Sequence, residues 1–304
     1  MSALGQATGR RARRRALATA GELVATGTAL LAGVGCDTPR LDAELLVAAA
    51  AGLDRMAVVA DPRRPLPTAV AERAWTLLAR RAQREPLAYI LGRKAFRRLE
   101  LAVDRRVLIP RPESELLVDV AVAEPAGAHV HEVGCGSGAI ALAIASERPD
   151  LRVTASDVSP AALAVARANA ERLGVAVELW QADLLPRQLE GGCDLVVANL
   201  PYVSEREWER LAPEIRCYEP RTALVAGPRG SELIEMLLAR CAPGQRVALE
   251  HAPWQAAAVR SWLERAHTLR DLAGYERVTV GRVPQRPTPD LQRQCDAGAL
   301  SCEH

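Results

Sequence analysis

The sequence predicts an α/β protein in which a mostly parallel sheet follows a small all-α bundle. From about residue 128 onwards, short β-rich runs alternate with helical segments, the pattern of a parallel sheet covered on both faces. Before residue 92 the apolar residues follow helical spacing only. The chain has 304 residues, and single cores usually stop growing at about 250–300 residues, so we expect two domains.

The first domain is expected to span residues 1–92. Thr38 and Pro39 supply an N-cap and a first-turn proline, and the helix that they start should end at Gly52. Its expected apolar stripe contains Leu41, Leu45, Leu46 and Ala49. Further helices are expected over 68–84 and 86–91, the first with an inner face of Val70, Ala74, Leu77 and Leu78.

Residues 93–112 read as an extended or hairpin connector. The pattern from Phe96 to Val107 favours extended segments with a turn at Asp104-Arg105. Pro110 and Pro112 exclude regular helix before Glu113, so a helix should follow the connector and run through Val120.

The second domain is expected over residues 113–284. Its predicted strands are Val130–Val133, Leu151–Ala155, Val175–Leu179, Asp194–Ala198 and Arg246–Glu250, with helices near 138–147, 160–172, 230–241 and 254–265. Leu272–Val283 should form a closing antiparallel hairpin. Residues 285–304 contain prolines and polar residues without periodicity, which is typical of a disordered tail.

Composition narrows the class of protein. Lys and Arg number 39 against 37 Asp and Glu, a balance that weighs against stable nucleic-acid binding, which needs clustered cations. The seven cysteines show no two-residue spacing, so we expect reduced thiols, a cytoplasmic location and no metal site. No apolar run could span a membrane, and the arginine-rich stretch at 10–15 reads as an exposed basic helix. We also expect a monomer.

A glycine-rich loop follows the first predicted strand. It comprises Gly134, Cys135, Gly136, Ser137 and Gly138 and is preceded by Glu132. The spacing differs from the dinucleotide fingerprint, and a carboxylate suits a cationic aminoacyl-sulfonium ligand better than a pyrophosphate. Asp157 ends the second strand, where an acid usually binds ribose hydroxyls, and Asp183 ends the third, near the expected adenine position. Together these features predict an adenosyl-nucleotide site.

Asn199, Leu200, Pro201 and Tyr202 follow the fourth strand and read as a methyl-acceptor pocket. An amide or exocyclic amine is a weak nucleophile, because its lone pair is delocalised. The Asn199 oxygen and the Leu200 carbonyl could accept the two hydrogens of such an NH₂ group and so orient it. Pro201 favours an extended Leu200, and Tyr202 offers a flat face to a planar group.

These residues resemble the class I methyltransferases with their Rossmann-like sheet, and more closely the protein-glutamine methyltransferases that modify peptide chain release factors. Besides the loop and the tetrapeptide, the likeness rests on residues 39–44, 85–92, 108–113, 219–224 and 276–280. The resemblance implies S-adenosyl-L-methionine as cofactor, S-adenosyl-L-homocysteine as product, and the glutamine of a Gly-Gly-Gln loop as acceptor. By position, it also implies that Gly134–Gly138, Asp157 and Asn199 contact the cofactor. It also implies an N-terminal domain that helps to dock the release factor, the protein partner.

Three positions depart from the family pattern. Leu200 replaces the first of two prolines, Glu132 replaces an aspartate, and Leu184 stands where an aromatic residue often stacks on adenine. Asn-Leu-Pro-Tyr is also the form seen in ribosomal RNA adenine dimethyltransferases. An adenine methyltransferase acting on RNA or DNA is therefore the alternative, with the pocket holding a flipped base. A non-catalytic adenosyl-nucleotide-binding protein is a third reading, against which the intact loop, Asn199 and Tyr202 argue.

Overall fold

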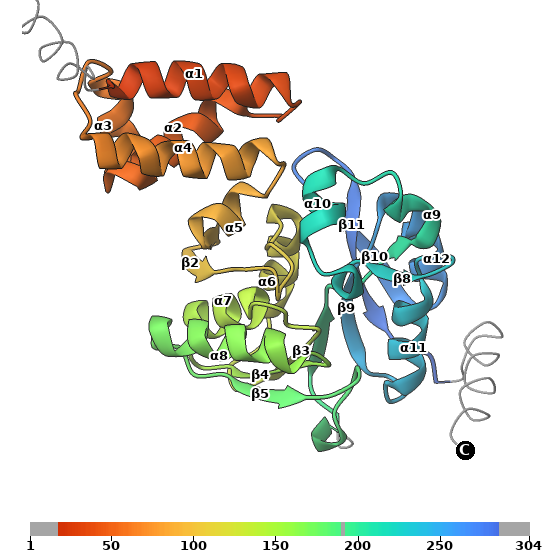
Figure 1. Ribbon diagram of the computed structural model, residues 1–304. Helices are drawn as coiled ribbons and strands as arrows, with labels where there is room; N and C mark the ends of the chain where they lie inside the picture. Colours follow the sequence, from red (N-terminus) through yellow and green to blue (C-terminus); the bar gives the residue numbers. More distant parts are fainter. Residues whose placement is uncertain (1–17, 190–191, 286–304) are drawn as a thin grey trace, which may run out of the picture. The chain divides into compact units, whose positions relative to one another are not determined.

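The computed structural model describes residues 18–189 and 192–285 (Figure 1). The chain divides into two compact units, one up to Leu91 and one from Gly92 onwards. The basic helix expected at 10–15 lies outside the described residues, and so does the tail expected at 285–304 except for Gln285. Among the described residues, no helix has both the length and the apolar character needed to cross a bilayer.

The first unit is helical, as predicted. Its helices are α1 (Ala20–Gly33), α2 (Pro39–Ala51), α3 (Arg55–Ala60), α4 (Thr68–Ala82) and α5 (Leu87–Leu91). Gly52 ends α2 in the left-handed region at φ 66°, a conformation that glycine adopts without a Cβ clash.

Of the four residues in the apolar stripe predicted for α2, Leu46 alone is buried, because a polar pair turns a different face inward. Asp42 is buried and forms an ion pair with Arg81 of α4, with 2.7 Å between Oδ2 and Nε. Ala43, Leu46 and Val47 are buried beside it, whereas Leu41 is exposed. A charge is tolerated in a core when its partner is buried with it, which hydrophobic periodicity does not reveal.

The second unit begins with an antiparallel hairpin of β1 (Arg93–Phe96) and β2 (Leu99–Ala102). The turn of this hairpin is at Arg97, where φ is 51°. The sequence did not predict a turn at this position. The predicted turn after Asp104 is present, but it follows β2 instead of joining two strands. The 3₁₀ turn η2 (Pro112–Ser114) then leads into α6 (Glu115–Val122).

A seven-stranded, mostly parallel sheet forms the centre of this unit, which confirms the predicted fold class (Figure 1). Its strands are β3 (His129–Val133), β4 (Arg152–Asp157), β5 (Glu178–Gln181), β6 (Leu195–Ala198), β9 (Arg246–Glu250), β10 (Glu264–Arg270) and β11 (Glu276–Arg282). Their order is β10-β11-β9-β6-β3-β4-β5, and only β11 runs antiparallel to the other strands. The chain starts in the middle at β3, builds to one edge and then crosses to β6.

Helices cover both faces of the sheet. Alternate residues of β6 divide between two cores: Leu195 and Val197 face α6, α7 (Ala139–Glu147) and α8 (Pro160–Leu173), while Val196 and Ala198 face α11 (Glu232–Arg240) and α12 (Ala256–Ser261). This continuous burial is typical of a parallel strand.

Two parts of the second unit differ from the predictions. The hairpin strand β10 begins at Glu264, before the predicted Leu272, which is fully exposed in the turn. β10 lies at the sheet edge and is mostly polar, so it lacks an apolar run. For the stretch after β6 the sequence predicted no helices or strands. In the structure it forms β7 (Val203–Ser204), α9 (Glu205–Trp208), α10 (Pro213–Tyr218), η4 (Arg221–Ala223) and β8 (Val225–Gly227).

Candidate active site

The candidate site lies at the carboxyl ends of β3, β4, β5 and β6. β3 and β6 are neighbours, and the strand order reverses between them, so a crevice is expected at this point. Two cavities meet there. Leu108, Gly134, Gly136 and Asn199 line both of them. The first cavity extends to Asp157, Asp183 and Leu184, and the second to Glu132, Ser137 and Ser114.

The glycine loop turns sharply between β3 and α7. Gly134, Gly136 and Gly138 have φ angles of 76°, 53° and 82°, all in the region that disfavours side chains. A Cβ on Gly134 would lie 3.2 Å from Cδ2 of Leu200. The loop is therefore shaped so that bare backbone borders the cavity. The side chain of Cys135, within the loop, is buried, and burial raises the pKa of its thiol well above the usual range.

Glu132 lies beneath the loop, 2% exposed. Its Oε2 accepts a hydrogen bond from the backbone N–H of Ala141 in the first turn of α7, over 2.8 Å. Burial raises the pKa of this carboxyl well above its usual range, and the nearby Asp157 adds to the effect. A cation in the adjoining cavity would favour the ionised form of the Glu132 carboxyl. The ionised carboxylate would in turn stabilise a bound ammonium or sulfonium group.

Asp157 joins the loop to the start of α8. Its Oδ2 accepts from the N–H of Gly136 and its Oδ1 from the N–H of Ser159, each over 2.8 Å. Burial raises the pKa of this carboxyl. Each oxygen keeps a lone pair for a further donor, so the carboxyl can fix the loop and still bind a hydroxyl group.

Asp183 and Leu184 occupy the end of β5 differently from each other. The Asp183 carboxylate is 65% exposed and pairs with Arg240, 3.1 Å from Nη2, so a role towards adenine stays a prediction. Leu184 is buried in the cavity wall at φ 63°, a conformation that leucine rarely adopts. Its carbonyl accepts a hydrogen bond from Ser156 Oγ, which is itself 3.0 Å from Nε2 of the buried His131.

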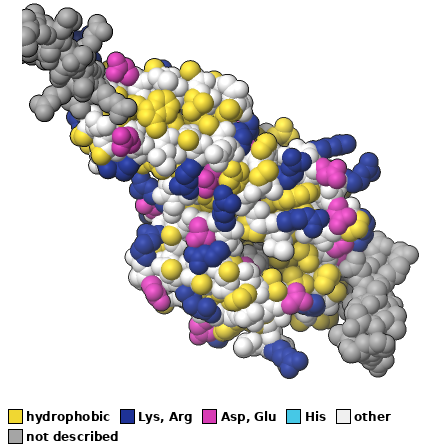
Figure 2. All heavy atoms as spheres, viewed as in Figure 1, with side chains coloured by type: hydrophobic (Ala, Val, Ile, Leu, Met, Phe, Trp, Pro, Cys, Tyr) yellow, Lys and Arg dark blue, Asp and Glu magenta, His cyan; other side chains and the backbone are white. Residues whose placement is uncertain are grey.

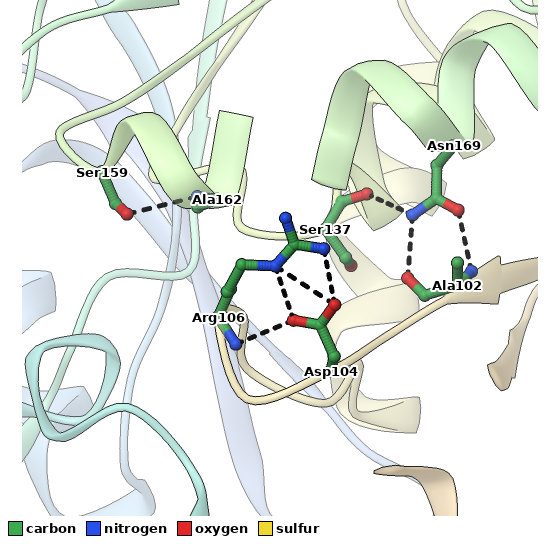
Figure 3. A network of polar contacts seen from close by, with 7 residues as sticks. All are labelled: Ala102, Asp104, Arg106, Ser137, Ser159, Ala162 and Asn169. Atoms are coloured by element: carbon green, nitrogen blue, oxygen red, sulfur yellow. Dashed lines mark hydrogen bonds and ion pairs between the residues drawn. The ribbon is translucent and has the colours of Figure 1, made fainter. Parts of the chain in front are cut away.

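Asn169 of α8 ties the loop to the hairpin (Figure 3). Its Oδ1 accepts from the N–H of Ala102, and its Nδ2 donates to the carbonyls of Ala102 and Ser137. The Asp104–Arg106 ion pair lies close by in the same view. The side chain of Asn169 is fully buried, and its bond to the Ser137 carbonyl is shielded from water, while the two bonds to Ala102 are partly buried.

Asn199 stands at the boundary of the two cavities. Its Nδ2 donates a hydrogen bond to Ser114 Oγ over 2.8 Å. Within the described part of the chain, neither its Oδ1 nor the Leu200 carbonyl has a hydrogen-bond partner. Leu200 and Pro201 line the first cavity. Two acceptor atoms from neighbouring residues are therefore available at one place, as the orientation of an NH₂ group requires.

Tyr202 is held at both ends. Its hydroxyl lies 3.4 Å from Oε1 of Glu250 at the end of β9, and its carbonyl accepts from Gln255 Nε2 over 3.1 Å. Burial raises the pKa of Tyr202, and the neighbouring Glu250 adds to the effect. The carboxyl of Glu250 is itself buried, and its Oε2 has no hydrogen-bond partner among the described residues.

A strap formed by the connector and the segment after α10 closes the first cavity. Glu219 is buried and accepts hydrogen bonds from the backbone N–H of Ile109 and from the guanidinium of Arg111. The residues that follow Glu219 line the cavity wall: Pro220, Thr222 and Ala223.

Sequence reasoning missed several residues of the site, among them Ser114, Glu250, Asn169 and the cavity-lining residues of the strap. Motifs near 108–113 and 219–224 resemble family features, but nothing in their spacing indicates that they meet.

A metal site is not expected from the sequence. Within residues 18–189 and 192–285, no cluster of three His, Cys, Asp or Glu side chains is arranged to hold a metal ion.

Two family profiles match the chain. Residues 22–92 match the family profile described as the PrmC N-terminal domain, and residues 112–216 match that of the methyltransferase small domain. The fold and the site thus define an α/β methyltransferase with a helical N-terminal region.

Relatives give the family. The chain is 37% identical over 263 residues to a release factor glutamine methyltransferase of Geobacter sulfurreducens. This alignment covers 83% of this chain and 93% of the relative. It is 39% identical over 268 residues to that of Caulobacter vibrioides, covering 83% and 92%. For that of Mycolicibacterium smegmatis the identity is 43% over 239 residues, covering 75% and 83%. The chain belongs to the release factor glutamine methyltransferase family.

Proposed function

We propose that this protein transfers a methyl group from S-adenosyl-L-methionine to the side-chain amide nitrogen of the glutamine in the Gly-Gly-Gln loop of a peptide chain release factor. The observation that carries the proposal is the pair of available acceptors, Asn199 Oδ1 and the Leu200 carbonyl, at the boundary of two cavities. Family membership supports the identity of the acceptor.

The residues present fit the methyl donor. The cavity wall at Gly134 would be narrowed by any Cβ, Glu132 can balance a cationic aminoacyl end, and Asp157 can accept from ribose hydroxyls. When bound, S-adenosyl-L-methionine supplies an electrophilic methyl carbon on a sulfonium. Leu200 and Leu184, which depart from the family pattern, both line the first cavity and would therefore contact the bound donor or the acceptor.

The protein's own groups would act on the acceptor. Asn199 Oδ1 and the Leu200 carbonyl each accept one hydrogen of the glutamine NH₂, which turns its lone pair towards the methyl carbon. Methylation leaves a cationic nitrogen that loses its proton readily, so no strong base is required. Tyr202, which follows the cavity-lining Pro201, would offer its ring to the planar amide.

The helical first unit is proposed to help dock the release factor, in line with its match to the PrmC N-terminal domain profile. Nucleic acid is not expected as a stable partner. On the visible face of the molecule, Lys and Arg side chains are interspersed with Asp and Glu (Figure 2). A mixed surface favours a protein substrate over a polyanion.

The test is incubation with methyl-labelled S-adenosyl-L-methionine and purified release factor, in parallel with ribosomal RNA and with DNA. We expect label on the peptide that contains the Gly-Gly-Gln glutamine, located by mass spectrometry. Label on nucleic acid alone would replace the proposal with an adenine methyltransferase, the function that the Leu200 form of the tetrapeptide would favour.

A further inference from the structure

Leu184 forms part of the wall of the first cavity in a backbone conformation that needs support. Its φ of 63° lies in the left-handed region, which a leucine keeps only where its surroundings hold it there. Its side chain belongs to the same buried cluster as Val133 and Leu200, and all three residues line that cavity. The backbone conformation at residue 184 therefore decides where this part of the wall stands.

Four hydrogen bonds run from the start of β3 to the carbonyl of Leu184. Nε2 of His129 lies 2.9 Å from Thr154 Oγ1, which lies 2.8 Å from Nδ1 of His131. Nε2 of the same His131 ring lies 3.0 Å from Ser156 Oγ, and this hydroxyl donates to the Leu184 carbonyl over 3.1 Å. The three inner residues of this chain of hydrogen bonds are fully buried: His131, Thr154 and Ser156.

The Leu184 carbonyl sets the direction of the protons. A carbonyl oxygen can only accept, and among the described residues Ser156 is its one hydrogen-bond donor. Because the Ser156 proton is used there, Ser156 Oγ accepts from Nε2–H of His131. Burial lowers the pKa of His131 to about 3, so the ring is neutral and Nδ1 accepts the proton of Thr154. A proton on Nδ1 instead would leave the buried Leu184 carbonyl without a donor, which is costly.

The ring of His131 is held from its face as well as from its edges. It stacks on Trp180 of β5, with 5.6 Å between the ring centroids and 21° between the planes. The backbone of His131 pairs with Thr154 on one side and Val196 on the other, in the interior of the sheet. The chain of hydrogen bonds therefore links a fixed ring in the sheet to the segment after β5 that carries Leu184.

We infer that His131 and Ser156 are positioning residues for the methyl donor, because their hydrogen bonds tie the Leu184 carbonyl to the sheet and so hold the Leu184 side chain in the cavity wall. Neither residue lines either cavity, so each acts on the ligand only through Leu184. The inference deepens the proposed function and rests on it, since it takes S-adenosyl-L-methionine as the occupant of the first cavity.

Ser156→Ala removes the donor to the Leu184 carbonyl. We expect the Kd for S-adenosyl-L-homocysteine, measured by titration calorimetry, to rise about tenfold. The KM for S-adenosyl-L-methionine should rise by a similar factor while kcat changes less than about twofold, because the wall contacts the ligand alike in the ground state and the transition state.

Thr279→Ala is the matched control. It removes an equally buried hydroxyl, 2.7 Å from Nε2 of another buried histidine, His251. Neither Thr279 nor His251 lines either of the two cavities. The control should lower the free energy of unfolding but change the Kd less than about twofold. A rise in Kd equal to that of Ser156→Ala would contradict the inference.

Leu184→Gly separates positioning from general stabilisation. Glycine adopts the left-handed conformation freely and has no side chain to place. In this background Ser156→Ala should change the Kd less than about twofold, against about tenfold with leucine present. A tenfold loss in both backgrounds would mean that Ser156 only stabilises the sheet, and the inference would be wrong.

The direction of the protons can be read in the wild type. In protein labelled with ¹⁵N-histidine, NMR should find the ring proton of His131 on Nε2 and none on Nδ1. A proton on Nδ1 would show that Ser156 donates to the histidine and not to Leu184. That result overturns the inference even if Ser156→Ala does not fold. An unchanged Kd in Ser156→Ala overturns the inference alone, whereas a wild type that binds no S-adenosyl-L-homocysteine overturns the proposed function with it.

Discussion

Arg111 forms an ion pair with Glu219, whose side chain is 1% exposed, and so joins the proline-rich connector to the segment after α10. The same carboxyl accepts from the N–H of Ile109 at a distance of 3.1 Å. Two stretches more than a hundred residues apart are thereby held together over the first cavity. The strap is a tertiary arrangement that neither stretch could form alone.

Removing Arg111 should loosen the strap. Arg111→Ala leaves the buried Glu219 with only the backbone donor, and we expect a loss of about 1–3 kcal/mol in the free energy of unfolding, less than for a fully buried pair because Arg111 is 30% exposed. Affinity for S-adenosyl-L-methionine should fall too. Urea unfolding and calorimetric titration measure both. The comparison is Arg152→Ala, which breaks an exposed pair with Glu178; equal losses in the two variants would contradict the prediction.

Gly134→Ala should separate backbone strain from interference with the cavity. At φ 76° an alanine costs about 1–2 kcal/mol, and its Cβ would also press on Leu200 at 3.2 Å. Gly127→Ala is the matched control, since its φ is 80° and no atom lies within 4 Å of the added carbon. Both variants should lose similar stability, but only Gly134→Ala should lose several-fold affinity for S-adenosyl-L-methionine. Equal affinities would show that the loop does not border the ligand.

Asn169→Ala removes all three hydrogen bonds that tie the hairpin to the glycine loop. The substitution leaves two carbonyls and one N–H without this partner. Because the Asn169 side chain is fully buried and its bonds to Ala102 are partly buried, we expect a cost of about 2–4 kcal/mol in the free energy of unfolding. Arg106→Ala, which breaks the exposed pair with the neighbouring Asp104, should cost no more than about 1 kcal/mol. Chemical denaturation of the two variants side by side gives the comparison, and a loss for Asn169→Ala as small as that of Arg106→Ala would be incompatible with the network.

Asn199→Ala should leave cofactor binding largely intact and reduce turnover severely. The loss of one preorganised acceptor is expected to lower kcat on the order of 10²-fold or more. The Kd for S-adenosyl-L-homocysteine, measured by titration, serves as the internal control. Near-normal turnover on release factor would mean that the acceptor pocket has been assigned to the wrong residues.

The buried carboxyl of Glu250 should make stability depend on pH in a predictable direction. Burial raises its pKa to about 7 from the ordinary 4.5; the neighbouring Glu113 also raises it, while Ser114, Tyr202 and Arg277 lower it. A raised pKa in the folded state means that the stabilising effect is fully present below about pH 4.5 and is lost as the pH rises to about 7.

Glu250→Gln removes this titration. Relative to wild type, the variant should therefore gain free energy of unfolding between pH 5 and pH 8, by about 3 kcal/mol at most. Urea unfolding at several pH values measures the difference. A difference that stays constant over this range, or one that changes in the opposite direction, would contradict the raised pKa.

Strands of the parallel sheet were predictable from the sequence because burial on both faces selects continuous apolar runs, as in Leu195–Ala198. β10 was misplaced because an edge strand can be polar: none of its residues is buried, and exposed and half-buried residues do not alternate regularly along it, so the pattern resembles a loop. The inner face of α2 was misread for a related reason. The ion pair of Asp42 with Arg81 is buried, whereas the pattern treats every charge as exposed.

The candidate site was predictable where it follows strand ends. The glycine loop, Asp157 and Asn199 all come directly after parallel strands, whose carboxyl ends meet at one edge. Ser114 and Glu250 could not be found in this way. Ser114 precedes the sheet in the sequence, and Glu250 closes a strand far downstream. The contact of Ser114 with Asn199 and that of Glu250 with Tyr202 therefore depend on packing that local patterns do not encode.

The two hydrogen bonds that Asp157 accepts from Gly136 and Ser159 have a thermodynamic consequence. They order the glycine loop and the start of α8 when the chain folds, so this conformational entropy is not lost again on association with a ligand. Binding of S-adenosyl-L-homocysteine should therefore show a heat-capacity change set by the apolar surface that the ligand itself buries. A contribution from loop folding should be absent, and the association rate should be free of a slow ordering step.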